Sequence, residues 1–338
     1  MNRTLLLLVA VVALGVLAWF ALAGSGAQSS SRAVSNDREF AYPEFSEVDR
    51  IFIADRRNHQ VTLTRGGVTG WLSDGKPANE NIMKNLVPVL RDLEIRTLPT
   101  SKAVPNMIKT LATEGIRVQL YDKEGNELRD YYLGGATHDE LGTFAIMDGS
   151  ENPYVVHLPN FTGNVKARLN HWGDEWRDRV YFRVVPEQLE ELRIDYPKQQ
   201  NKSFRLVRDG EGFRVSPLYD TGQPTATVPR GVAERVLSKY EKYYVNRFEN
   251  GDREAIAEAR QLLPFAIISV KQEGEEEKVM TVYPKYDEQQ FTTDPKTGAT
   301  NLAGGLAAFR AFINEGEDWV LLNVETTQPL LVGYDNFR

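Results

Sequence analysis

The pattern of apolar and polar positions begins with one unbroken apolar run. Leu5–Ala23 holds 19 residues and no charge. A helix rises about 1.5 Å per residue, so this run would span roughly 28 Å, close to the ~30 Å hydrocarbon core of a bilayer. Residues 1–24 are therefore predicted to form a transmembrane helix, by which the chain contacts a membrane.

The charges beside this run predict its orientation. Arg3 precedes it, and the next basic residue is Arg32. Positive charge before a span keeps the N-terminus in the cytoplasm. We therefore expect a single-pass protein of the inner membrane whose bulk is periplasmic or extracellular. Cleavage after Ala21-Leu22-Ala23, as in a signal peptide, is the alternative, and it exports the same bulk. The Gly- and Ser-rich start of residues 25–46 predicts a flexible stalk.

Behind the stalk, the alternating pattern of strands occurs twice. Short runs with apolar residues at every second position, bounded by glycines, predict strands in a hairpin or meander. The second set follows the first at an offset of 141 or 142 residues. The matching runs are Ile51–Ile53, Val61–Arg65 and Trp71 in the first set, and Leu192–Ile194, Phe204–Arg208 and Phe213 in the second.

Each set is followed by helical periodicity and then by further strands. Apolar residues three or four apart predict a helix at Ile82–Leu93 and another at Val232–Tyr243. A second helix is predicted near Met107–Leu111 in the first set. In the second set it covers Arg253–Leu263, with Asp252 as its N-cap. The returning strands are Ile116–Leu120, Leu128–Leu133, Thr143–Met147 and Tyr154–Leu158 in the first set, and Phe265–Val270, Lys278–Tyr283, Trp319–Asn323 and Leu330–Val332 in the second.

Strands and helices in separate blocks predict an α+β fold with antiparallel sheets. The whole chain is then a transmembrane helix followed by two tandem copies of one unit. The first copy covers residues 47–160, a linker covers 161–186, and the second copy covers 187–338.

The second copy carries an insertion, residues 284–318, that the first copy lacks. Within it, apolar residues at positions i, i+4, i+7 and i+11 predict one helical face, with a further aromatic residue beside it. Long insertions on repeated scaffolds often carry function, so we expect a partner-binding helix here. The alternative is that this face packs on its own sheet. The candidate binding residues are Leu302, Leu306, Phe309, Phe312 and Ile313.

Composition narrows the classes of partner. The net charge of −7 argues against nucleic acid, which requires a concentrated basic face. The absence of cysteine excludes disulfides, thiolate metal sites and cysteine nucleophiles. The sequence contains no phosphate-binding glycine loop and no dinucleotide-binding fingerprint, so no nucleotide is expected. We predict no catalytic residue, no metal and no cofactor.

One cluster of polar residues in the linker suggests a rival function. His171, Asp174 and Glu175 would share a face if they were helical, and could then hold a divalent ion for a metal-assisted hydrolase. Against this, Gly173 weakens such a helix, and Arg177 and Arg179 offer ion-pair partners to the acids. A ligand-binding module with a cleft between the repeats is a further alternative.

Beyond these patterns, the chain resembles a family of bacterial proteins with a domain of unknown function. The resemblance lies in the N-terminal apolar run and in three stretches, Ile51–Ile95, Tyr131–Pro159 and Glu175–Ile194. Members are membrane-anchored, carry a repeated α+β unit outside the cell membrane, and are often encoded beside ABC-type transport components of the gliding-motility kind. The resemblance implies a binding or scaffold role as an accessory of an envelope complex, with a protein partner there, and it carries over no catalytic residue.

Overall fold

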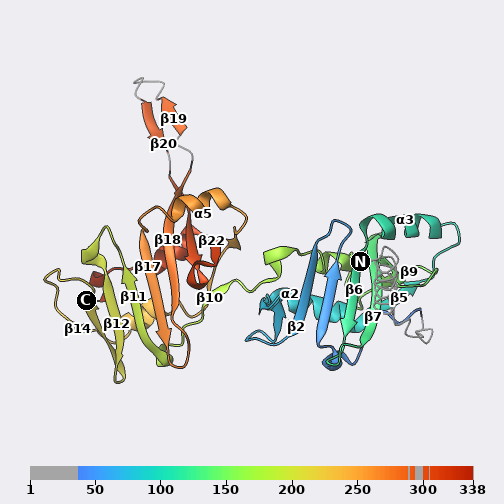
Figure 1. Cartoon of the computed structure of the whole chain (residues 1–338), viewed down its shortest axis with the longest axis horizontal. Coiled ribbons are helices and arrows are strands. Elements are labelled where there is room, and N and C mark those ends of the chain that lie inside the picture. The colour runs from blue at the N-terminus through green and yellow to red at the C-terminus, as the bar shows by residue number, and fades with distance from the viewer. Residues whose placement is uncertain (1–36, 288–289, 294–299, 304, 338) are drawn as a thin grey trace, which may run out of the picture. The chain divides into compact units, whose positions relative to one another are not determined.

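The computed structural model describes residues 37–287, 290–293, 300–303 and 305–337. The chain divides into two compact units whose main parts are Val87–Leu169 and Asn170–Arg338. Each unit contains most of one nine-stranded antiparallel sheet (Figure 1).

The prediction of a single-pass inner-membrane protein has to be corrected. No helix in the described part of the chain is long and apolar enough to cross a bilayer. The predicted span Leu5–Ala23 lies outside the described residues, as does the stalk up to residue 36.

The first sheet is built from the strands of the first repeat. Its order is β4 (Lys76–Pro77), β3 (Trp71–Ser73), β2 (Gln60–Arg65), β1 (Arg50–Ala54), β6 (Ile116–Tyr121), β7 (Glu127–Ala136), β8 (Thr143–Met147), β9 (Tyr154–His157) and β5 (Glu94–Thr97). Two helices accompany it, α2 (Glu80–Asp92) and α3 (Val104–Glu114). Pro88 lies inside α2 without ending it, and the helix buries Met83, Leu86, Val89 and Leu90.

The second sheet has the corresponding strands. Its order is β14 (Ala226–Thr227), β13 (Gly212–Pro217), β12 (Phe204–Asp209), β11 (Leu189–Asp195), β17 (Ala266–Gln272), β18 (Lys278–Tyr286), β21 (Leu306–Ile313), β22 (Asp318–Leu322) and β16 (Arg247–Phe248). Its α-helices are α4 (Val232–Leu237), α5 (Arg253–Ala259) and α6 (Val324–Thr327).

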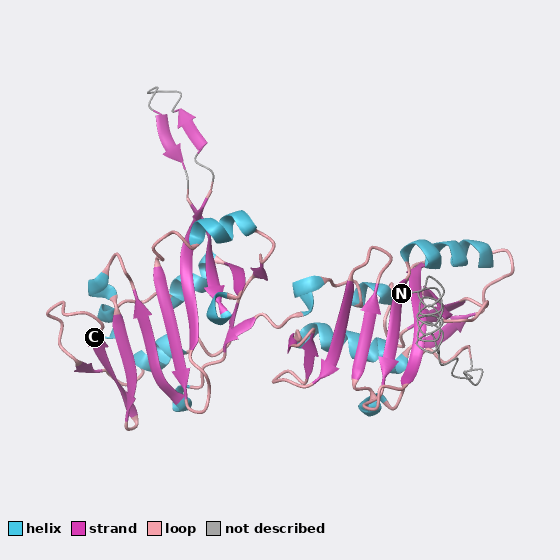
Figure 2. Ribbon diagram, viewed as in Figure 1, coloured by secondary structure: helices cyan, strands magenta, loops and turns pink. Residues whose placement is uncertain are grey.

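Short elements complete the described chain. Two small sheets pair β10 (Val180–Phe182) with β15 (Tyr243–Tyr244), and β19 (Gln290–Thr293) with β20 (Thr300–Ala303). The β19–β20 hairpin lies beyond the end of β18 and β21 (Figure 2). Single 3-10 turns occupy Phe45–Glu47, Val165–Arg168, Gly173–Trp176, Pro186–Gln188, Gln200–Lys202, Asn314–Gly316, Gln328–Leu330 and Tyr334–Phe337.

Both nine-stranded sheets have the same strand order. In each, the first four strands form a meander at one end, four later strands follow, and a short strand from the middle of the repeat closes the far edge. That closing strand is β5 in the first sheet and β16 in the second. The repetition inferred from the sequence is therefore visible in the topology.

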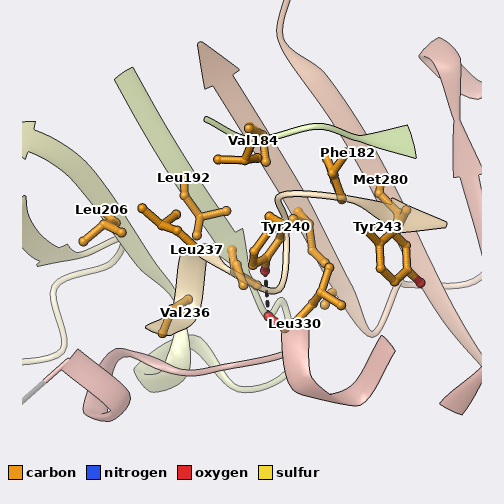
Figure 3. Close-up of a cluster of buried hydrophobic side chains, with 14 of the residues drawn as sticks. Phe182, Val184, Leu192, Leu206, Val236, Leu237, Tyr240, Tyr243, Met280 and Leu330 are labelled. Atoms are coloured by element: carbon orange, nitrogen blue, oxygen red, sulfur yellow. Dashed lines mark hydrogen bonds between the residues drawn. The ribbon is translucent and has the colours of Figure 1, made fainter. Parts of the chain in front are cut away.

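The core of the second unit lies on one face of its sheet. Alternate residues of β11, β12 and β18, among them Leu192, Leu206 and Met280, point to this face and are fully buried. Val236 and Leu237 of α4 and the following Tyr240 cover them (Figure 3). The buried Tyr240 hydroxyl donates a 2.7 Å hydrogen bond to the Leu330 carbonyl, which satisfies both polar groups.

The predicted α+β fold class is wrong, because the described chain is mainly β. Its strands form two nine-stranded antiparallel sheets, whereas most of its helices are short. The predicted helix at Val232–Tyr243 ends at Leu237, and the one at Arg253–Leu263 ends at Ala259. Residues Leu330–Val332, predicted as a strand, do not form a strand. Leu330 belongs to a 3-10 turn instead.

The largest error concerns the insertion in the second copy. Residues 306–313, predicted as helix, form strand β21 between β18 and β22. Phe309, Ala311 and Ile313 enter the core described above, and the opposite face of the strand is covered by α5. A strand covered on both faces carries apolar residues on both, so alternation is lost and a helical spacing appears by coincidence.

Candidate functional site: an open pocket on the second sheet

The second face of the second sheet, which we call its outer face, carries a cluster of aromatic side chains. Phe312 of β21 lies opposite Thr281 of β18 and opposite Trp319 of β22. Since opposite residues of neighbouring strands share a face, these three side chains form one row across the sheet. Tyr283, two residues after Thr281, joins them on the same face.

The aromatic rings of this cluster contact one another. The ring centroids of Phe312 and Trp319 are 4.5 Å apart, and that of Tyr283 lies 5.9 Å from Phe312 and 5.8 Å from Trp319. Ile256 and Ala259 of α5 pack on the cluster. Trp319 is almost fully buried, whereas Tyr283 is only half-buried, so the cluster is covered at one end and accessible at the other.

An ion-pair network holds the start of α5 on this face. The guanidinium of Arg310, on β21, lies 2.9 Å from a carboxylate oxygen of Glu249 and 2.9 Å from one of Asp252. Asp252 is also the predicted N-cap, because its other oxygen accepts a 3.1 Å hydrogen bond from the Ala255 backbone N–H. The Asp252 carboxylate therefore caps the N-terminus of α5 and also bonds it to Arg310 of the sheet.

Next to α5 the outer face is open. A pocket of about 500 Å³ lies over β18 and β21. Val279, Thr281, Tyr283 and Phe312 form its floor, and Arg260 and Glu315 are its charged lining residues. The guanidinium carbon of Arg260 is 5.5 Å from the Phe312 ring centroid, within the range of a cation–π contact.

The turn that borders this pocket has a strained backbone. It joins β21 to β22, and its residues Asn314, Glu315 and Gly316 have φ angles of +49°, +56° and +85°. Glycine adopts such angles without cost and asparagine at low cost, but glutamate does so rarely. The Glu315 side chain lies beside the pocket.

The registers of the two sheets show what occupies the same place in the first one. The aligned pairs of opposite residues are Leu133–Ala145 in the first sheet and Val282–Ala311 in the second. The residue after Leu133 on β7 is Gly134, and the residue after Val282 on β18 is Tyr283, so these two occupy equivalent positions. An added Cβ at Gly134 would lie 3.0 Å from Leu111 of α3, and one at Gly135 would lie 3.0 Å from Thr110. In the first sheet, α3 thus packs directly on the strand position that Tyr283 occupies in the second sheet.

The chemistry that this arrangement supports is binding. The floor is apolar and aromatic, and burial raises the pKa of Tyr283, which keeps its hydroxyl protonated near neutral pH. Aromatic side chains and arginine are the residue types that contribute most to protein interfaces. The pocket is therefore suited to an apolar group flanked by charge.

The five candidate residues of the sequence analysis divide between the two faces. Phe312 lies in the pocket floor, whereas Phe309 and Ile313 are buried in the core on the opposite face and Leu306 is half-buried. The side chain of Leu302 lies outside the described residues. Because the segment is a strand, the exposed helical face on which the expected partner binding rested is not found. Sequence reasoning missed Tyr283, Trp319 and Arg260. The change from Gly134 to Tyr283 between the copies marks this place, but it can be recognised only from the strand register.

The rival cluster at His171 is held mainly by ion pairs. Asp174 accepts a 2.9 Å bond from Arg177, the partner suggested by the sequence. His171 Nδ1 is 3.9 Å from a Glu175 oxygen, and burial lowers the pKa of His171. Among the described residues, no group of three or more His, Asp or Glu side chains is placed to hold a metal ion.

The Arg177 guanidinium also makes two hydrogen bonds, of 2.8 and 2.7 Å, to the buried Asp318 carboxylate. Asn250 and Asn314 donate to the same carboxylate. Burial alone would raise the pKa of Asp318, but the hydrogen bonds from Arg177 and Asn314 outweigh it and lower the pKa to about 2. A carboxylate that stays ionised and fully bonded positions its neighbours and is a poor general base.

Fold and site together define a tandem antiparallel-sheet protein with an open pocket on its second sheet. No protein-family model matches the chain, and no curated protein or solved structure matches it significantly.

Proposed function

We propose that this chain is a protein-binding scaffold whose second sheet receives a partner at the outer-face pocket. One observation carries the proposal. Where the first copy packs α3 directly on Gly134 and Gly135, the second copy has the half-buried Tyr283 and an open pocket beside it. The accessible part of Tyr283, with Arg260 and Glu315 beside it, offers a surface to another molecule. The accessory role in a transport-type complex, implied by the family resemblance, stays a prediction.

The proposal is tested by site-specific photo-crosslinking in cells of the source organism. A benzoylphenylalanine placed at Glu315, beside the pocket, should give one discrete crosslinked species that contains a second protein. The same group at the exposed Leu98, which follows β5 of the first sheet, should not give that species.

Two substitutions on the same sheet make the test specific. Thr281→Arg fills the pocket from its floor and should abolish the crosslink at position 315. Val207→Arg adds the same side chain to the outer face of β12, away from the pocket, and should leave the crosslink intact. A crosslink that survives Thr281→Arg, or no crosslink at all, contradicts the proposal.

A further inference from the structure

We infer that the linker pocket, a cavity bordered by the linker, the start of α2 and strand β16, binds a neutral saccharide. This place is separate from the outer-face pocket, so the inference goes beyond the proposed function. The linker pocket has a volume of about 600 Å³, within the usual range of small-molecule sites. Its lining residues all belong to the second compact unit, which includes Asn58–Leu86 as well as Asn170–Arg338. Those that carry the argument are Asn81, His171, Trp172, Glu175, Arg179 and Phe248.

Main-chain hydrogen bonds hold the walls of the linker pocket together. The Asn79 N–H, just before α2, donates a 2.7 Å bond to the Trp176 carbonyl. The Val245 N–H, just before β16, donates a 2.8 Å bond to the Arg179 carbonyl. Through these two bonds the linker, with its 3-10 turn Gly173–Trp176, is attached to α2 on one side and to β16 on the other. The pocket is therefore preformed, as small-molecule sites usually are.

The apolar surface of the linker pocket includes three rings. His171, Trp172 and Phe248 line the pocket, and each of them is half-buried. The Trp172 ring centroid lies 5.2 Å from that of His59. The His171 ring centroid lies 5.4 Å from that of Trp176. Rings that are held by other rings and still half-exposed offer fixed apolar surfaces, on which the C–H face of a sugar ring can pack.

The charges around the linker pocket balance, which favours a neutral ligand. The charged lining residues are two carboxylates and two guanidiniums, Asp174, Glu175, Arg179 and Arg247. Arg247 donates twice to Glu249, and Asp174 accepts a bond from Arg177, so both charges are already compensated within the protein. Burial lowers the pKa of His171, so its imidazole is neutral near neutral pH. A phosphate or a polyamine would therefore meet as much like charge as opposite charge.

Several polar groups of the linker pocket have hydrogen-bonding capacity to spare. The Asn81 side chain makes no hydrogen bond with the part of the chain that the structure describes. Arg179 uses only one of its N–H groups, which donates a 2.8 Å bond to the Asn246 carbonyl. Glu175 uses one carboxylate oxygen, which accepts a 3.0 Å bond from the Trp172 backbone N–H. Unused donors and acceptors therefore line the same pocket, and a sugar hydroxyl is both a donor and an acceptor.

Titration of the full-length protein with three neutral trisaccharides tests the inference. The probes are maltotriose, cellotriose and N,N′,N″-triacetylchitotriose, each at concentrations up to about 10 mM. We expect at least one of them to bind saturably and to shift the NMR signal of the Trp172 indole N–H. Trigalacturonate, which has sugar rings of the same size but carries negative charge, should bind at least tenfold more weakly than that trisaccharide, because the carboxylates of the pocket repel it.

Substitutions assign the binding to the linker pocket. Asn81→Trp fills the pocket from α2 and should weaken binding at least tenfold, whereas Arg91→Trp adds the same side chain at the exposed end of α2 and should have no effect. Trp172→Ala should also weaken binding, whereas Tyr244→Ala removes an exposed ring that does not line the pocket and should not.

The two proposals fail separately. Thr281→Arg, which fills the outer-face pocket, should bind the saccharide as the parent protein does. The inference is overturned if none of the three trisaccharides binds, or if trigalacturonate binds more tightly than all of them. It also fails if Asn81→Trp and Trp172→Ala both bind as the parent does. None of these results bears on the crosslink at position 315.

Discussion

At the scale of single residues, the strained turn between β21 and β22 shows that the pocket has a cost in stability. Glu315 holds a φ of +56°, which a glycine would adopt freely. Strain of this kind persists where the surrounding structure imposes it, often beside binding sites.

Glu315→Gly should therefore stabilise the protein, by about 1 kcal/mol in urea unfolding. Glu315→Ala is the matched control, since it removes the same side chain but keeps the strained backbone, and it should bring no such gain. Equal effects of the two substitutions would show that the backbone angle is not the cause.

The buried carboxylate of Asp318 predicts a dependence of stability on acid. Its pKa is about 2 in the folded protein, below its ordinary value of 3.8. Its contribution to stability is therefore complete above pH ~4 and is lost as the pH falls through about 2. The shift corresponds to roughly 2 kcal/mol. Asp318→Asn should accordingly be destabilised at pH 6, and its deficit relative to the parent protein should shrink by roughly this amount between pH 5 and pH 2. A deficit that is independent of pH would contradict the assignment.

At the scale of elements, the close contact between α3 and β7 depends on glycine. Leu111 packs where a Cβ at Gly134 would lie 3.0 Å from it. Gly134→Ala should cost about 1–3 kcal/mol in the free energy of unfolding, because the helix must move or the side chains must shift. Gly251→Ala is a suitable control, since its Cβ would meet nothing within 4 Å and its backbone angle is ordinary. If both cost the same, the contact is not what requires glycine at position 134.

The same elements show how far the sequence could predict the fold. The hairpins, the N-cap at Asp252, α3 and the repetition of the unit follow from local patterns, and the structure contains them. Strand β21 was mistaken for a helix because its two covered faces erase the alternation. The edge strands β5 and β16, of four and two residues, are too short to leave a pattern. The pocket was not predictable from local patterns, because it arises from a shorter helix and from Tyr283 at the position of Gly134, and this equivalence appears only once the register is known.

At the scale of the whole molecule, the β19–β20 hairpin is an addition to a sheet that is complete without it, whereas the rest of the insertion supplies β21. In the described part of the chain, β19 and β20 pair only with each other, and the last pair of the main hairpin is Tyr286–Leu306. Replacing residues 287–305 by Thr137–Gly142, the loop that joins β7 to β8 in the first sheet, should therefore leave the melting temperature within about 4 °C of the parent. A larger loss, measured by calorimetry, would show that the β19–β20 hairpin supports the sheet.

The placement of β5 and β16 at the closing edge has a consequence for folding during synthesis. Each of these strands is made before four further strands of its own sheet, yet each pairs only with the last of them, β9 or β22. While the ribosome is still translating a unit, its closing strand has no neighbour to join. A nascent chain arrested before Asp318 has left the exit tunnel should therefore leave Arg247 and Phe248 open to proteases, and release of the next five residues should protect them in a single step.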